Sequence, residues 1–443
     1  MKPFFVLAFA VTACFNLQAL AADELPAEQQ ADARLQSTYI WQAKPSFNAA
    51  YSGPNSLIPE REKSYTFSVT GFLGFRPWAG GELYFNPEMT QGVAFSNLDG
   101  LAGFTNGELT RVSGTRPSFY RQRLFLRQNW NRGGGRIGID TDMNQLAGAV
   151  DRNRWVLTLG NFSTLDVFDD NAYAKDPLSQ FMNWGNMTYA AYDYAADARG
   201  FGWGAALEWF HDDWVLRYGR MTGPKQPNML PVDMRIGKHY GEQFEIEHDH
   251  ELAGLPGKLR LLFWRDRANL ASFADASSYL LANPDDPDHQ TLLKVRNGDK
   301  FKLGAGVNIE QALNRDSGIF LRAMASDGRT ETYAFTEADA SFAAGLSVKG
   351  EAWGRSGDSL GLSWLANRLS RDRRRYLEAG GISFFIGDGA LRYRPEAIFE
   401  AYYGWRLTKS LSLSGDYQHV ANPAYNADRG PVNFIGMRTH TAF

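Results

Sequence analysis

The feature that most constrains this chain is a two-residue alternation of side-chain character, which recurs in segments of about ten residues. In residues 118–130, SFYRQRLFLRQNW, Leu124 and Leu126 fall on one face and three arginines on the other. The arginines are Arg121, Arg123 and Arg127. A soluble strand buries its apolar face, whereas a strand of a membrane barrel turns that face to lipid and its charged face to a water-filled lumen. The connections between the segments distinguish the two.

Short and long connections between these segments alternate along the chain. Short turns rich in Gly, Asp, Asn and Ser, such as 314–317 and 408–410, join two segments into a pair, and these residues favour tight reversals. Long polar stretches separate the pairs, so that all of them emerge at the same rim. They are residues 222–241, 269–300, 327–340, 370–395 and 421–432. The strands of a β-sandwich would also show alternating side-chain character, but a sandwich does not require its long loops to lie at one rim.

Counting segments backward from the C-terminus gives about fifteen strands, and the alternation of direction requires one more, at residues 37–47. We therefore predict an all-β fold, a transmembrane antiparallel barrel of about sixteen strands. One connection does not fit, because residues 131–152 stand where a short turn is expected.

The two ends of the chain indicate export to the outer membrane. Lys2, the apolar run 4–13 and the small residues Ala19 and Ala21 form a secretory signal peptide, and the run is too short to span a membrane. The last strand alternates and ends on Phe443, a pattern typical of substrates of the barrel assembly machinery. We expect a signal peptide, a short periplasmic segment and a single barrel domain. These are residues 1–21, 22–36 and 37–443.

Composition and motifs exclude several classes of protein. The single cysteine, Cys14, lies in the signal peptide, so the mature chain can have no disulfide, thiol nucleophile or cysteine metal site. A lipoprotein signal ending at this cysteine is the less favoured interpretation. The formal net charge of −3 argues against a nucleic-acid partner. No G-x-S-x-G elbow is present, so we expect neither an enzyme nor a cofactor; a carboxylate pair within 166–176 is the enzyme alternative.

Polar side chains on the predicted inward faces define a candidate pathway. The arginines of residues 118–130 are matched by acidic groups on other strands. Opposite charges across a pore orient water and offer hydroxyl-rich solutes many hydrogen bonds. The candidates on strands are Glu82, Asn86, Glu88, Arg121, Arg123, Arg127, Arg217, Glu245 and Glu247.

The most distinctive stretch is residues 159–186, LGNFSTLDVFDDNAYAKDPLSQFMNWGN. It places acids and amides next to aromatic rings, which suits sugars because they need directional hydrogen bonds and a surface for stacking. Its candidates are Asp166, Asp169, Asp170 and Asn171. The stretch resembles a segment of the carbohydrate-selective porin family (OprB type) of Gram-negative outer membranes. Residues 45–57, 144–148 and 416–423 extend this resemblance over nearly the whole mature chain.

The resemblance implies a barrel narrowed by loops that fold into the pore, with Arg and Glu at the constriction and simple sugars as solutes. For the narrow zone it points to Glu88, Arg121, Arg123, Arg127, Asp166 and Asp170. Residues 348–359 depart from the turn typical of glucose-selective members, which leaves the sugar open. An anion- or sugar-acid-selective porin, with the arginine column as its filter, is the alternative.

The expected partners are small sugars, outer-membrane lipid and lipopolysaccharide, and the barrel assembly machinery, while association into trimers is left open. The basic run 371–375 lies in a long loop, where contact with lipopolysaccharide phosphates is one interpretation and solvation the other. Residues 140–151 resemble a calcium loop, but Gln145 stands where that loop needs glycine. We therefore expect no metal site, and His248 and His250 lack an identifiable third ligand.

Overall fold

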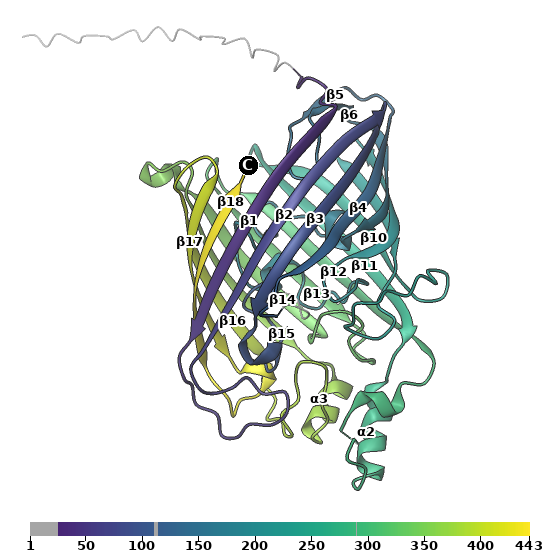
Figure 1. Cartoon of the computed structure of the whole chain (residues 1–443), viewed down its shortest axis with the longest axis vertical. Coiled ribbons are helices and arrows are strands. Elements are labelled where there is room, and N and C mark those ends of the chain that lie inside the picture. Colours follow the sequence, from purple (N-terminus) through teal and green to yellow (C-terminus); the bar gives the residue numbers. More distant parts are fainter. Residues whose placement is uncertain (1–24, 110–113, 289) are drawn as a thin grey trace, which may run out of the picture.

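A closed antiparallel barrel makes up most of the molecule (Figure 1). The computed structural model describes residues 25–109, 114–288 and 290–443, and the predicted signal peptide lies outside them. Sixteen strands form the barrel, as predicted. They are β1 (Ala31–Lys44), β2 (Glu62–Trp78), β3 (Gly81–Val93), β4 (Ser118–Asn131), β7 (Arg154–Phe162), β8 (Gly202–His211), β9 (Trp214–Met221), β10 (Tyr240–Leu252), β11 (Leu255–Asn269), β12 (Asp299–Ala312), β13 (Ser317–Ser326), β14 (Ala340–Lys349), β15 (Ser359–Arg368), β16 (Glu396–Arg406), β17 (Leu411–Ala421) and β18 (Val432–Ala442).

Each barrel strand pairs with the barrel strands before and after it in the chain. The barrel closes where β1 pairs with β18, with Tyr39 opposite Thr439. Side chains alternate between lumen and outer wall, as the period of two requires. In β2, Thr66 and Thr70 are buried in the lumen, whereas Leu73 and Phe75 face outward and are 46% and 52% exposed. The exposed apolar wall is what a lipid-facing barrel needs.

Exposed tryptophans gather on the wall near the rim of short turns. They include Trp78, Trp130, Trp155, Trp214 and Trp405. Amphipathic indole rings favour the level of the lipid headgroups, so this ring of side chains marks one membrane interface.

One expected boundary is corrected, and the over-long connection is explained. The first strand begins at Ala31 rather than at residue 37, so the expected periplasmic segment 22–36 is partly barrel wall. The over-long connection 131–152 contains a separate two-stranded sheet of β5 (Arg136–Ile139) and β6 (Gly148–Asp151). This hairpin lies at the rim where β1 begins and β18 ends (Figure 1). Its Ala147 carbonyl accepts a hydrogen bond of 3.0 Å from the Gln29 amide.

The long loops emerge at the opposite rim and carry the helices (Figure 1). These are α2 (Phe273–Ala282) and α3 (Arg371–Glu378), whose rings Phe273 and Tyr376 lie 5.7 Å apart. In α3, Arg373 is buried and pairs with Asp339 at 3.1 Å, so this member of the basic run 371–375 is not available to lipopolysaccharide. Within the described residues, no helix is long and apolar enough to cross a membrane.

Residues 163–201, the inner loop, fold into the barrel instead of covering its rim. Polar side chains of the barrel wall hold its backbone at several points. The Glu400 carboxylate accepts the Met182 amide at 2.6 Å, and Arg438 donates to the Pro177 carbonyl at 2.7 Å. Lys302 pairs with Asp193 at 2.8 Å. The inner loop contains η2 (Thr164–Asp166) and α1 (Trp184–Met187). It therefore fills the side of the lumen formed by β10 to β18.

Candidate functional site

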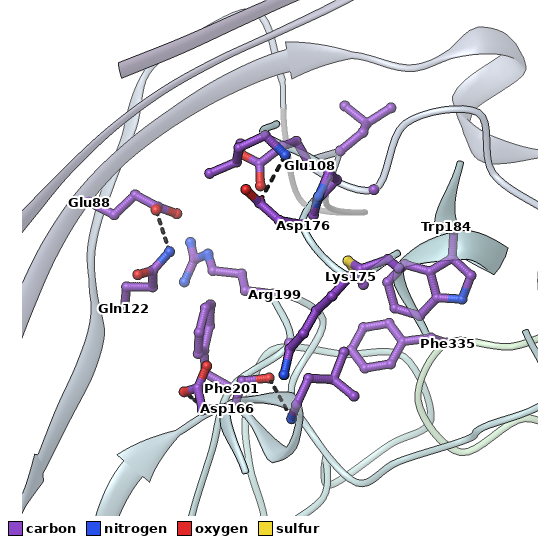
Figure 2. Close-up of a pocket in the computed structure, with 18 of the residues that line it drawn as sticks. Glu88, Glu108, Gln122, Asp166, Lys175, Asp176, Trp184, Arg199, Phe201 and Phe335 are labelled. Carbon is purple, nitrogen blue, oxygen red and sulfur yellow. Dashed lines mark hydrogen bonds between the residues drawn. The ribbon is translucent and has the colours of Figure 1, made fainter. Parts of the chain in front are cut away.

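An open space remains between the inner loop and the wall formed by β3 and β4. We call this space, about 520 Å³ in volume, the inner cavity. Charged and polar side chains from the wall, from the inner loop and from the loop between β3 and β4 point into it (Figure 2). Those discussed below are Glu88, Glu108, Gln122, Arg123, Asp166, Lys175, Asp176 and Arg199.

Arg123 and Asp166 form the central ion pair of the inner cavity. The guanidinium donates from Nε and Nη2 to the two carboxylate oxygens, each at 2.7 Å, and this forked geometry is the strongest that the two groups can adopt. Asp166 is oriented by the start of η2, where its carboxylate accepts the Ser163 amide at 2.9 Å. Burial raises the pKa of Asp166, but the charge and hydrogen bonds of Arg123 lower it by more, so the group stays ionised.

Glu88 faces the same space from β3. Its carboxylate accepts hydrogen bonds from Thr70, at 2.6 Å, and from Tyr120 and Gln122. Three donors from the wall hold the carboxylate in one orientation. A solute in the cavity therefore meets a preorganised acceptor.

Basic groups of the inner loop face these acids. Lys175 pairs with Asp170 at 2.9 Å, and its charge holds the pKa of Asp170 well below the usual range. Arg199 lies over the ring of Tyr120, 4.1 Å from its centroid, and donates to Ser118 at 3.2 Å.

Aromatic rings line the other side of the inner cavity. Trp184 lies 5.4 Å from Phe335 and is stacked with Tyr194 at 6.2 Å. Figure 2 shows Trp184 and Phe335 across the space from Glu88 and Gln122. The cavity therefore offers hydrogen-bonding groups on one side and apolar faces on the other.

Glu108 gives the inner cavity a titratable group near neutral pH. Burial, reinforced by the negative charges of Glu88 and Asp176, raises the pKa of Glu108 to about 8, and its carboxyl accepts a hydrogen bond from Ser68 at 3.2 Å. The group is neutral below this pKa and negative above it.

We expect the cation preference of the channel to rise as the pH increases from about 6 to about 9, because Glu108 then adds one negative charge. Reversal potentials across a salt gradient measure this preference. Glu108→Gln, which stays neutral, should remove the pH-dependent step. An unchanged step in that variant would assign the titration to another group.

A second chamber of about 610 Å³ lies toward the rim of short turns. Glu82 and Arg127 line it, as does Arg76, which pairs with Glu82 at 2.7 Å. Asn86 is buried and donates at 2.9 Å to Asn144 of the hairpin connection, a residue that lines the inner cavity. Three predicted residues, Glu82, Asn86 and Arg127, thus lie in or near the lumen but outside the inner cavity.

Five predicted pathway residues are buried where the inner loop meets the barrel wall. Arg217 pairs with Glu245 and Glu247, both at 2.9 Å, and the Glu245 carboxylate accepts the Asp169 amide at 2.9 Å. The Asn171 side chain donates to Asn308 of β12 at 2.7 Å. These groups lie where the inner loop meets the wall and anchor the loop there, and they are not among the described residues that line the open space.

Arg121 is corrected, because it lies on the outer wall. In the pairing of β3 with β4, Asn86 lies opposite Arg123 but the next residue, Pro87, lies opposite Arg121, so Gln122 is an extra residue in β4. A bulge of one residue exchanges the faces before and after it. Arg121 is exposed and lies over the ring of Trp203, 5.0 Å from its centroid.

Sequence reasoning missed Glu108, Lys175 and Arg199. All three lie in loops, where no period of two assigns a side chain to a face. The acid-rich stretch 159–186 indicated a functional loop, but its composition pointed to the aspartates as site residues and not to Lys175.

The calcium-like segment, residues 140–151, consists of the connection between β5 and β6 and of β6 itself, and within it Gln145 donates to the Asp140 carbonyl at 2.8 Å. His248 stacks on Trp214 with ring centroids 4.2 Å apart. In the part of the chain that the structure describes, no three His, Cys, Asp or Glu side chains are grouped to hold a metal ion.

A closed sixteen-stranded barrel with a charged lumen narrowed by an inward loop defines a porin, a channel of the outer membrane. The sequence profile described as "Carbohydrate-selective porin, OprB family" matches residues 74–443, and the chain belongs to this family. Members of this class are channels rather than enzymes. A search of curated proteins found no significant match.

The solved structures similar to this chain include outer-membrane channels of Pseudomonas and Acinetobacter. The high-pH structure of Pseudomonas putida OprB has a TM-score of 0.66 at 15% identity, over 94% of each chain. The low-pH structure of the same protein has a TM-score of 0.49 at 13% identity, over 94% of this chain and 93% of that one. The channel DcaP of Acinetobacter baumannii has a TM-score of 0.47 at 10% identity, over 94% and 98%. At 15% identity, the similarity to the high-pH OprB structure indicates the fold alone.

Proposed function

We propose that the chain lets simple neutral carbohydrates diffuse passively across the outer membrane, with the inner cavity as the constriction. The observation that carries the proposal is the pairing of fixed charged groups on one side of this cavity with aromatic rings on the other. Sugar hydroxyls both donate and accept hydrogen bonds, and a pyranose ring has an apolar face that stacks on aromatic rings.

The proposed mechanism exchanges hydration for several weak contacts. Asp166 and Glu88 accept hydrogen bonds from hydroxyls, while Arg123 and Arg199 donate to them. Each of these side chains is already held by protein partners, so none has to reorganise when a sugar arrives. Affinity must remain low for rapid release, as in other selective channels.

The charge of the cavity favours neutral sugars over anions. Among its described lining residues, three are basic (Arg123, Lys175 and Arg199) and five are acidic (Glu88, Glu108, Asp142, Asp166 and Asp176), of which Glu108 is neutral below its pKa of about 8. Basic groups therefore do not dominate the lining. The arginine column of the anion-filter alternative is also interrupted, because Arg121 faces outward.

Swelling of liposomes that contain the purified protein tests this proposal. We expect rapid entry of a neutral monosaccharide and at least about threefold slower entry of the corresponding sugar acid, because net negative charge repels the acid. Amino acids of similar size serve as the comparison for simple sieving. Faster entry of the sugar acid than of the neutral sugar would overturn the proposal.

We further propose that the chain is exported with cleavage near Ala21 and inserted by the barrel assembly machinery through its C-terminal strand. The alternating outward residues of β18, including Ile435 and Met437, support this route. The mature chain then consists of a short N-terminal segment and the barrel.

A further inference from the structure

An apolar groove lies on the outer wall of the barrel, close to the rim of long loops. Its volume is about 380 Å³, and its lining includes Leu159, Trp203, Met234, Ile236 and Arg220. The first two come from β7 and β8, and the next two from the loop after β9. The groove is therefore built from apolar side chains and has an arginine in its lining.

The position of the groove in the membrane follows from the strand ends. Trp203 is the second residue of β8, and Arg220 is the last but one of β9. Arg121 is the fourth residue of β4. All three ends adjoin long loops, so these side chains lie at the headgroup level of the outer leaflet, opposite the tryptophan-rich rim.

Positive charge exceeds negative charge around the groove. Arg121 stacks on Trp203 and donates to Asn161 at 3.4 Å, and among the described residues it makes no ion pair. Arg220 and Arg265 both donate to the single carboxylate of Glu242, each from Nε at 3.1 Å. Two guanidinium groups thus share one negative charge, and Arg121 adds a third cation.

We propose that this surface, the arginine-edged groove, binds a phosphorylated glycolipid of the outer leaflet. An acyl chain would occupy the apolar groove, and a phosphate would lie between Arg121 and Arg220. Arginine suits this role because its fork of donors binds phosphate oxygens and because its weakly hydrated guanidinium tolerates a lipid interface. Basic clusters at membrane surfaces attract anionic headgroups for the same reason.

The apolar groove and the surplus of guanidinium groups together favour a phosphorylated glycolipid as the ligand. An ordinary lipid-facing wall needs no surplus of guanidinium groups, and a site for free phosphate needs no apolar groove. A lipid that carries acyl chains and phosphate on one molecule satisfies both. The site lies outside the pore, so it is independent of the proposed transport function.

Native mass spectrometry of the purified full-length barrel in detergent tests the proposal. The probes are bisphosphorylated lipid A and the same lipid with its phosphates removed. We expect the wild type to bind the phosphorylated form at least about tenfold more tightly. Arg121→Gln combined with Arg220→Gln should abolish this preference. Arg136→Gln combined with Arg152→Gln removes two arginines at the opposite rim and serves as the matched control.

Equal preference in the wild type and in the Arg121/Arg220 variant would overturn the proposal. A wild-type oligomer that the same variant dissociates, without any phosphate preference, would overturn it in favour of an interface between copies. Arg121→Lys with Arg220→Lys keeps the charge and should retain part of the preference. Liposome swelling with neutral sugars should be unchanged in all these variants, which also verifies that each barrel is folded.

Discussion

Replacing Arg123 with glutamine is expected to weaken the binding of neutral sugars inside the channel by about tenfold. Arg123 holds Asp166 through two hydrogen bonds of 2.7 Å and contributes donors of its own to the inner cavity. A hydrogen bond to a charged group contributes about 1.5–3 kcal/mol, and about 1.4 kcal/mol corresponds to a tenfold change in affinity. Current block by added sugar in planar bilayers gives the affinity directly.

Arg127→Gln is the matched control for this variant. Arg127 lies on the same strand and also faces the lumen, where its guanidinium lies over Tyr84, but it lines the second chamber. We expect its effect on sugar affinity to be less than about threefold, because it lies outside the constriction. Equal losses in the two variants would mean that the inner cavity is not the place where sugars bind.

Replacing Arg322 with methionine is expected to release the inner loop from the wall and to widen the channel. Arg322 is 1% exposed and donates to Asp169 Oδ1 at 3.0 Å, to the Ala174 carbonyl at 2.6 Å and to the Asn186 carbonyl at 2.9 Å. Removing one partner of a buried pair costs about 3–5 kcal/mol, since the other charge is left unpaired. Single-channel conductance should rise, and sugars too large for the wild type should enter liposomes.

Arg76→Met provides the control for Arg322→Met. Arg76 is also buried in the lumen and pairs with Glu82 at 2.7 Å, but its other partners, Glu28, Gln29 and Ala147, lie outside the inner loop. We expect protease cleavage within residues 163–201 only in the Arg322 variant. If both variants keep the loop protected and the conductance unchanged, Arg322 does not hold the constriction in place.

The fold could be predicted from the sequence to a large extent. A period of two assigns each side chain to a face, and the order of short and long connections gives the number and direction of strands. All sixteen strands follow from these two patterns. The start of β1 at Ala31 was missed because ADARLQ, residues 31–36, carries little of the apolar alternation that marked the other strands.

The candidate site could be predicted only in part, for two physical reasons. An extra residue at Gln122 exchanges the faces of β4, and such a bulge leaves no compositional trace, so Arg121 was assigned to the wrong face. Lumen-facing polar residues also look the same in sequence whether water or a loop covers them. For this reason Arg217, Glu245 and Glu247 were interpreted as pathway residues although they anchor the inner loop.

The most direct test of the central claim is the single-channel current of the wild-type protein in a planar bilayer with sugars added. We predict reversible block by a neutral monosaccharide at concentrations on the order of millimolar, together with weak ion selectivity. The corresponding sugar acid should block less. Strong anion selectivity without block by neutral sugars would contradict the account and would identify the basic groups of the inner cavity as an anion filter.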